Sequence, residues 1–462
     1  QNGGKMKRKF ALLLICALTV TSLSACGSAA SETKNATSEQ PIEATQESEK
    51  EPAGEQADDS AASGLSEDAE SYSGTIQVWS WTNDPEYQIA AFEKAYPNIK
   101  VEFTQIGTDY DTKMQTIVDN ETDGPDVFYS DVKNVKNYIE SEAWDNLSAD
   151  PYNADTSDMV PYCVELASDT DGNLRALTYQ ATPGGFWYKR DLALEYLGTD
   201  DPAEISGMLS TMDGVLETAE KIKTASNGET HMFASYQDLW NMANYGMRTT
   251  PWVENGKFIV DEYVPVFFDL AKTIRDNDYD AKLDWWSDAW YSAAADKSIF
   301  GYTLPTWGLL NVMQTGAPDS KGNWAIASLP ASYFNGGSYL GIYQKSANKE
   351  LAWLYIDFVC RNQEYLKQYA VDKADYTSSM SVNQTVAQGY ENEWCRDQNT
   401  ITFFTEELDK INTSIVTKYD DVIGNLMLSN IDLYLNGTLS KEEALEQFKA
   451  DVAGNYRSLV VE

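Results

Sequence analysis

The chain has a single histidine, His231, among its 462 residues. One histidine cannot form a multi-histidine metal site, and it leaves little room for histidine-dependent catalysis. We expect His231 in a loop or on the surface, and we expect no metal and no cofactor. Cysteine is also scarce, because only Cys163, Cys360 and Cys395 follow Cys26. These three cannot all pair, and no two have the spacing of a zinc site. The sequence does not decide whether Cys360 and Cys395 form a disulfide.

Basic residues are few as well. The chain has 34 Lys and Arg against 72 Asp and Glu, for a net charge of −38. Nucleic-acid binding needs lysine and arginine to neutralise phosphates, so nucleic acid is excluded as a partner. Docking onto anionic lipid through a basic patch is disfavoured for the same reason. Much of this acidic excess serves only solubility.

The N-terminal residues have the order of a secretory signal. Lys7, Arg8 and Lys9 precede an apolar run over residues 10–20, which is shorter than the roughly 20 residues that cross a membrane. The sequence Leu-Ser-Ala-Cys at residues 23–26 resembles a bacterial lipobox. That resemblance implies a lipoprotein signal peptide at residues 1–25 and a lipid on the sulfur of Cys26. An ordinary secretory signal with a chance cysteine is the alternative.

Residues 26–72 have a different composition, rich in Ser, Glu, Ala and Thr. Two lysines stand against twelve acidic residues, and before Tyr72 the only strongly apolar side chains are Ile42 and Leu65. Such a segment cannot bury enough apolar surface to offset the entropy of ordering. We therefore predict a disordered, lipid-anchored acidic linker. An acidic interaction tail is the other interpretation.

From Ser73 onward the chain is long enough for two lobes and a large core. Its first part alternates strand and helix patterns, with Asn83-Asp84-Pro85-Glu86 as a helix start. The predicted elements are strands at 75–81, 99–103 and 126–129, a helix that ends before Pro97, and a helix at 108–119. This β-α-β-α-β order predicts an α/β fold with a parallel open sheet, whose ligand lies beyond the carboxyl ends of the strands.

The later part of the chain shows the same kinds of pattern. The predicted elements there are strands at 174–178, 185–188, 324–329 and 339–343 and helices at 208–226 and from 348 onward. Trp285, Trp286 and Trp290 have helical spacing. Aromatic residues are abundant, with 13 Trp and 28 Tyr. Many of these rings must fill the core, but tryptophan and tyrosine beside amides and carboxylates also suit sugars, because a ring face covers the apolar face of a pyranose.

Four segments resemble the extracellular solute-binding proteins that serve ABC importers, and specifically their carbohydrate-binding branch (family 1). They are AYPNIKVEF (95–103), DGPDVFYSD (123–131), LRALTYQATPGGFWYKRDL (174–192) and WAIASLPASYFNGGSYLGIYQKSANKELAWLYIDFV (324–359). The chain departs from the family where Tyr188-Lys189-Arg190 replaces Tyr-Asn-Lys and where Thr178 replaces a proline. It also lacks the family's Pro-x-Thr-Trp segment, and Asp201-Pro202-Ala203-Glu204 stands in its place.

The resemblance implies a two-lobed, periplasmic-binding-protein-like fold with discontinuous lobes joined by hinge strands. The implied lobes are residues 73–180 plus about 336–375, and residues 181–335 plus about 376–462. Ligand contacts both lobes only in the closed state, so binding shifts the open–closed equilibrium. The implied protein is not an enzyme. It binds a carbohydrate and delivers it to the permease of an ABC transporter.

Strand positions in the family imply a set of ligand-binding residues, with Trp307 the strongest candidate. The set is Trp81, Asn83, Asp84, Tyr129, Asp131, Tyr179, Gln180, Thr182, Trp307, Gly337, Tyr339 and Tyr376. Helix capping is the alternative role for Asp84, and core packing is the alternative for Trp307. Secondary candidates, for which packing is the more common role, are Trp240, Trp285, Trp286 and Trp290.

Two other functions stay open from the sequence. The acidic residues could include the carboxylate pair of a surface glycoside hydrolase. The same fold could instead bind a polyamine through carboxylates and cation–π contacts. In either case we expect a monomer on the extracellular face of the cell membrane, held by the lipid on Cys26, in a Gram-positive cell.

Overall fold

The computed structural model describes residues 69–461. The predicted signal peptide, Cys26 and most of the predicted linker lie outside these residues. Within the described part of the chain, no helix is both long and apolar enough to cross a membrane.

The first lobe is built on a five-stranded sheet in the order β2-β1-β3-β10-β4. In β1, Ile76 and Val78 are buried while Thr75 and Gln77 are exposed, as the alternating pattern predicts. β1 pairs in parallel with both β2 and β3, which confirms the predicted parallel order, whereas β10 runs antiparallel to β3 and β4. The strands are β1 Gly74–Ser80, β2 Ile99–Gln105, β3 Val127–Asp131, β4 Leu177–Thr178 and β10 Ser338–Ile342.

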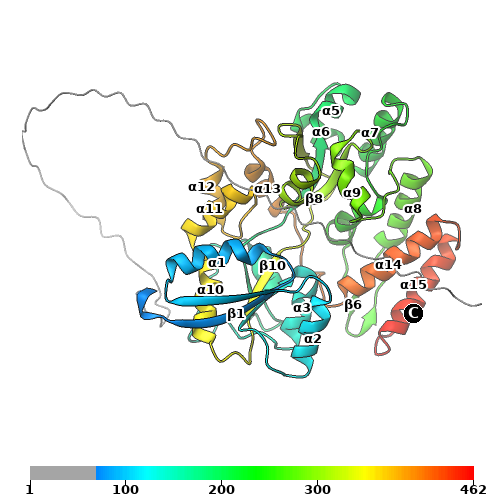
Figure 1. Cartoon of the computed structure of the whole chain (residues 1–462). Helices are drawn as coiled ribbons and strands as arrows, with labels where there is room; N and C mark the ends of the chain where they lie inside the picture. Colours follow the sequence, from blue (N-terminus) through cyan, green and yellow to red (C-terminus); the bar gives the residue numbers. More distant parts are fainter. Residues whose placement is uncertain (1–68, 462) are drawn as a thin grey trace, which may run out of the picture. The chain divides into compact units, whose positions relative to one another are not determined.

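Helices cover this sheet. α10 packs on β1 and β10 and also against α1, an arrangement that can be followed in Figure 1. The main helices of this lobe are α1 Asp84–Ala95, α2 Tyr110–Asp119, α3 Val132–Glu140, α4 Pro161–Ala167, α10 Lys349–Arg361 and α11 Gln363–Lys373. Pro85 opens α1 as predicted, but the side chain of Asn83 makes no capping hydrogen bond. Asp131 caps α3 by accepting from the backbone N–H of Lys133 at 3.0 Å.

The second lobe contains a three-stranded antiparallel sheet in the order β8-β5-β9. Its strands are β5 Gly184–Lys189, β8 Gly301–Pro305 and β9 Trp324–Ala327, and a separate hairpin joins β6 Val253–Glu254 to β7 Lys257–Phe258. The helices around it include α5 Arg190–Leu197, α6 Pro202–Met208, α7 Met212–Ala225, α8 Tyr263–Asp276, α14 Asp420–Leu435 and α15 Lys441–Asn455. α14 and α15 pack side by side (Figure 1).

Further helical segments complete the fold. They are η1 Ala69–Ser71, η2 Tyr236–Leu239, η3 Met242–Met247, α9 Asp288–Ser292, η4 Ala293–Ala295, η5 Leu309–Gln314, α12 Met380–Ala387 and α13 Thr400–Leu408. η3 and η5 are π-helical.

The helix predicted at 208–226 forms as α7, but it begins at Met212, because Thr211 accepts from the backbone N–H of Gly214 at 3.0 Å; Met208 ends α6. Two other predictions of local structure are wrong. The strand at 174–178 is reduced to β4. Trp286 has a φ of +63°, so the tryptophans at 285 and 286 precede α9 and are not part of it.

The chain passes between the two sheets at residues 179–183 and again at 328–337, and a last pass at residues 375–378 pairs with the first; all three are joined by hydrogen bonds. The N–H of Asn335 donates to the carbonyl of Thr182 at 3.1 Å, and the N–H of Ala181 donates to the carbonyl of Tyr376 at 3.1 Å. These paired segments are the hinge strands of a two-lobed fold.

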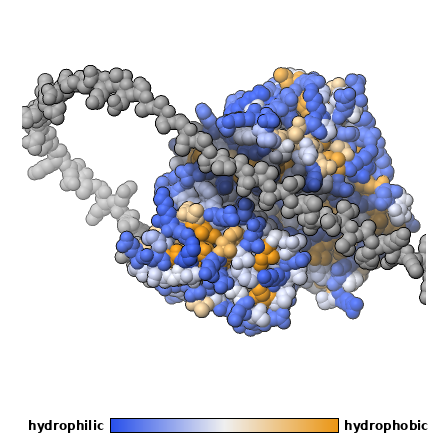
Figure 2. Space-filling model, in the orientation of Figure 1, coloured by the Kyte–Doolittle hydropathy of each residue, from blue (hydrophilic) through white to orange (hydrophobic). Residues whose placement is uncertain are grey.

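The core is divided into two clusters of buried side chains. The first surrounds the first sheet and extends onto one face of the second sheet, at Trp187 and Ile326, and the second cluster covers the other face of that sheet, at Phe186 and Ala327. Hydrophilic residues cover most of the face seen in Figure 2, with smaller hydrophobic patches between them. Cys163, Cys360 and Cys395 are buried free thiols, so the disulfide that the sequence leaves open is not formed. Burial raises the pKa of the Cys395 thiol to about 12, which makes it unreactive.

Candidate ligand-binding cleft

A cavity of about 400 Å³ lies where the hinge strands meet the two sheets. From the first lobe, Trp81 follows the end of β1, Asp84 lies in the first turn of α1, and Asp131 ends β3. The carboxyl ends of neighbouring parallel strands share one edge of a sheet, which is why residues far apart in the sequence meet here. This is the edge at which the strand order predicts a ligand.

The hinge supplies the floor of the cleft. Gly336 and Gly337 line it with φ values of +73° and +111°, a backbone region that favours glycine. The carbonyl of Gly337 accepts from the N–H of Val132 at 3.0 Å, which ties the floor to the end of β3. Gln180 lines the cavity from the first hinge pass.

The second lobe contributes a group of aromatic rings. Trp307 follows β8, and its Nε1 donates to the carbonyl of Asn335 at 3.1 Å, which fixes the plane of the indole. Trp286 lies beside it, with ring centroids 6.0 Å apart. Trp286 also packs on the buried Trp290 at 4.7 Å, and the Nε1 of Trp290 donates to Asp238 at 2.9 Å. The cleft is therefore faced by rings held from behind by the core.

Trp286 combines an exposed aromatic ring with a left-handed backbone, two features that are common at functional positions. Its side chain keeps 38% of its surface exposed, although it is a large aromatic ring. Its backbone lies in the left-handed region, where a bulky residue costs about 1–3 kcal/mol and persists only when its surroundings hold it there.

The charge in the cleft is negative. Asp84, Asp131 and Asp375 line it, and among residues 69–461 the only basic side chain that does so is Lys373. Desolvation raises the pKa of Asp131 to about 6, against a lowering effect of the hydrogen bond from Lys133 N. Desolvation likewise raises the pKa of Asp375 to about 6, although its carboxylate accepts from the hydroxyl of Tyr369 at 2.7 Å. Both groups combine a carboxylate with partial loss of water, which suits a ligand that donates hydrogen bonds.

Half of the candidate residues line this cavity. They are Trp81, Asp84, Asp131, Gln180, Trp307 and Gly337. Asp84 accepts from the hydroxyl of Thr82 at 3.1 Å, within the loop that leads into α1. Of the secondary candidates, only Trp286 lines the cavity.

The other half do not line it. Asn83 is exposed before α1. The side chains of Tyr129, Tyr179, Thr182, Tyr339 and Tyr376 are buried. Their polar atoms contact protein: the hydroxyl of Tyr129 lies 2.8 Å from that of Tyr355, and Thr182 donates to the carbonyl of Gly336 at 3.0 Å. In this conformation these side chains support the cleft from behind.

Several residues that line the cavity were not predicted from the sequence. They are Thr82, Tyr291, Leu310, Asn311, Asn335, Tyr369, Lys373 and Asp375. Tyr369 and Lys373 lie near the end of α11. Their spacing in the sequence indicates only an amphipathic helix and gives no sign of a binding site. Asp375 is adjacent to the predicted Tyr376. The sequence therefore predicts the correct hinge segment, but the residue of that segment that lines the cleft is Asp375.

Comparison with known proteins places this geometry in a family. Residues 88–399 match the family model described as bacterial extracellular solute-binding protein. One similar structure is an extracellular solute-binding protein family 1 (TM-score 0.73, 18% identity), with 82% of this chain and 99% of that chain covered.

Two further similar structures are proteins with sugar ligands. The GacH receptor of Streptomyces glaucescens, solved unliganded and with acarbose, has a TM-score of 0.67 and 18% identity over 84% of this chain and 100% of that one. The ABC transporter associated binding protein from B. animalis subsp. lactis, solved with beta-1,6-galactobiose, has a TM-score of 0.66 and 19% identity, with 84% and 98% covered. These structures support the fold, and the family match covers more than half of the chain. The chain therefore belongs to the bacterial extracellular solute-binding proteins, a family of binding proteins rather than enzymes.

Proposed function

We propose that this chain is the substrate-binding component of an ABC importer, and that it captures a sugar or oligosaccharide in the cleft and delivers it to the permease. The observation that carries this proposal is that tryptophan side chains from both lobes line the same cavity. Trp81 lies on the first lobe, while Trp286 and Trp307 lie on the second. A sugar ring held between them would contact both lobes and so favour the closed state.

The polar groups between the rings suit hydroxyls. Asn311 and Gln180 offer amides, and Asp131 offers a partly desolvated carboxylate. Small-molecule sites combine apolar ring surface with a few convergent polar groups, typically in about 300–1,000 Å³, and the cleft has both features at about 400 Å³.

The lobes that would close on the ligand are residues 73–180 plus about 336–375 and residues 181–335 plus about 376–462. The hinge passes between them are short and mutually hydrogen-bonded, which suits rotation of one lobe against the other.

The anchoring part of the proposal rests on the N-terminal sequence. A lipid on Cys26 and an acidic linker would hold a monomeric receptor on the extracellular face of a Gram-positive membrane, close to its permease. Expressing the full chain and the Cys26→Ala variant in a Gram-positive host tests this. We expect the unaltered chain in the membrane fraction and the variant in the medium; release of both would contradict lipid anchoring.

One observation favours a second candidate ligand, a polyamine. Three carboxylates in a cleft with aromatic walls suit a flexible polycation. Against this, two of these carboxylates have raised pKa values, because burial disfavours their charged form, and Lys373 lies in the same cavity. A neutral polyol needs no ionised partner, so we favour a sugar.

A thermal-shift screen of mono- and oligosaccharides, with spermidine as the competing ligand, distinguishes the two. Ligand at 100 times its Kd stabilises the native state by about 2.7 kcal/mol, which is a measurable rise in Tm. A shift with spermidine alone would refute the sugar proposal.

A further inference from the structure

Asp375 is a buried carboxylate that lines the ligand-binding cleft. Only 3% of its surface is exposed. Its two oxygens accept from neutral donors, Oδ2 from the hydroxyl of Tyr369 at 2.7 Å and Oδ1 from the backbone N–H of Tyr376 at 2.9 Å. A buried charge in a protein is normally paired with a charge of opposite sign, because it loses its hydration on burial. Asp375 has hydrogen-bond donors around it but no such pairing within the described chain.

The basic side chains near the cleft are engaged elsewhere. The ammonium of Lys373 lies over the ring of Tyr87, 4.6 Å from its centroid. The ammonium of Lys133 pairs with Asp111 at 3.5 Å. Within residues 69–461, none of the three carboxylates that line the cleft forms a salt bridge. The cleft therefore contains negative charge that the protein itself does not pair.

Like charges add to this imbalance. Desolvation, together with the charge of the Asp84 carboxylate, raises the pKa of Asp375 to about 6. Asp375 is still mostly ionised at pH 7, about one unit above that pKa. Two carboxylates in one cavity destabilise each other, and a positive charge near them relieves that repulsion. A ligand that brings a positive charge therefore gains free energy that a neutral ligand does not.

The rest of the lining limits how many positive charges the ligand carries. Tryptophan rings and the amides of Gln180 and Asn311 share the cavity with Asp375. Rings and amides suit the apolar faces and hydroxyls of a sugar. A polyamine brings several ammonium groups, each of which needs an ionised partner, whereas one ammonium group needs only one. A sugar with a single ammonium group matches both parts of the lining.

We infer that the ligand is an amino sugar, whose ammonium group pairs with the carboxylate of Asp375 while its pyranose ring lies against the tryptophans of the cleft. The inference rests on the proposed function, and it narrows the substrate class from sugars in general to sugars with one positive charge. Asp375 is the specificity-determining residue, because the ligand supplies the counter-charge that this carboxylate lacks.

Matched sets of sugars test the inference. Isothermal titration calorimetry at pH 7 compares glucosamine with glucose, N-acetylglucosamine and glucuronic acid. The N-acetyl form keeps a substituent on the same carbon but removes the charge, and the uronic acid reverses the sign of the charge. The galactose and mannose series, and the β-1,4-linked glucosamine dimer against cellobiose, extend the comparison to other stereochemistry and to a longer ligand.

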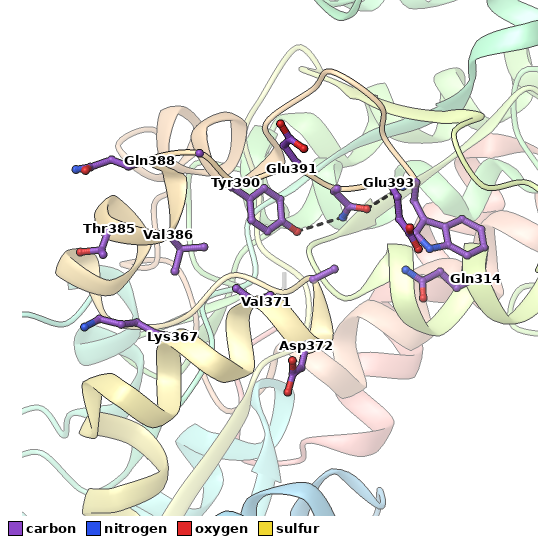
Figure 3. Close-up of a pocket in the computed structure, with 14 residues that line it drawn as sticks. Gln314, Lys367, Val371, Asp372, Thr385, Val386, Gln388, Tyr390, Glu391 and Glu393 are labelled. Atoms are coloured by element: carbon purple, nitrogen blue, oxygen red, sulfur yellow. Dashed lines mark hydrogen bonds between the residues drawn. The ribbon is translucent and has the colours of Figure 1, made fainter. Parts of the chain in front are cut away.

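Asp375→Asn removes the charge of the side chain and keeps its shape. Asp372→Asn is the matched control. Like Asp375, Asp372 accepts from a tyrosine hydroxyl at 2.7 Å, but it lies near the end of α11 and lines a separate cavity of about 670 Å³ (Figure 3). Circular dichroism and Tm establish that each variant is folded.

We expect the amino sugar of one series to bind about ten- to hundredfold more tightly than its neutral parent and its N-acetyl form, the range for a hydrogen bond to a charged group. The uronic acid should bind most weakly. Asp375→Asn should lose the preference for the amino sugar, and Asp372→Asn should keep it.

The unaltered chain provides a second measurement if Asp375→Asn does not fold. Its preference for the amino sugar should shrink between pH 7 and pH 5. The reason is that Asp375 and Asp131 become protonated below their pKa values of about 6, while the ammonium group of the sugar stays charged.

Two results would overturn the inference while leaving the proposed function in place. One is a neutral sugar that binds at least as tightly as its amino counterpart in every series. The other is a preference for the amino sugar that is unchanged in folded Asp375→Asn. If no sugar of any series binds, the proposed function fails and the inference fails with it.

Discussion

Substituting Gly336 by alanine changes the position of Trp307 without removing its ring. Gly336 has a φ of +73°, and a Cβ at this position would lie 3.1 Å from the Nε1 of Trp307. That contact is close enough to displace the indole by a few tenths of an ångström and so to disturb the hydrogen bond from its Nε1 to the carbonyl of Asn335. The substitution thus disturbs the proposed stacking surface while it keeps the Trp307 ring.

The substitution has two separable costs. An alanine in the left-handed region destabilises the fold by about 1–2 kcal/mol. Displacing Trp307 removes up to the value of one ring contact, about 0.5–1.5 kcal/mol, which raises Kd by about two- to twelvefold.

Gly437→Ala separates these costs. Gly437 has a φ of +76° after the end of α14, and a Cβ there would meet no atom within 4 Å. The backbone strain is therefore matched, while the cleft is untouched.

Differential scanning fluorimetry and calorimetric titration with the best sugar of the screen provide the two measurements. We expect a similar loss of Tm in both variants, and weaker sugar binding only in Gly336→Ala. Unchanged affinity in Gly336→Ala, at the same loss of Tm as Gly437→Ala, would refute the reasoning that the position of the Trp307 ring determines binding.

Three further predictions follow from single contacts. Trp307→Ala should weaken sugar binding at least as much as Gly336→Ala, as measured by the same titration; unchanged affinity would remove Trp307 from the site. Asp375→Asn should stabilise the unliganded protein more at pH 7.5 than at pH 5. The reason is that the folded pKa of about 6 exceeds the unfolded value, so the charged carboxylate destabilises the fold increasingly as pH rises through 6. Urea unfolding at the two pH values measures this, and an equal effect at both would contradict a raised pKa. Arg248→Met should cost about 3–5 kcal/mol in the same unfolding assay, because it leaves the buried carboxylate of Asp420 without its partner; a loss below about 1 kcal/mol would show that Asp420 becomes neutral instead.

Local patterns were sufficient for the fold class and for one side of the cleft. The alternation of Ile76 and Val78 and the proline start of α1 predict a strand followed by a helix. Repeated twice, this order predicts a parallel sheet, and hence that Trp81, Asp84 and Asp131 gather at one edge. Each step depends on residues close together in the sequence, where period and capping express backbone geometry directly.

Only the tertiary structure decided the other side and the depth of the cleft. Tyr369 and Asp375 line the cleft because α11 ends at the hinge, and the sequence of a helix does not say what lies opposite it. The left-handed backbone of Trp286 breaks the helical spacing that predicts packing, so its ring is exposed in the cleft. Tyr129 follows the pattern of a cleft residue but is buried against Gln88 and Tyr355. The residue types that suit a ligand are also those that suit a core, and long-range packing alone determines which of them remain exposed to the cavity.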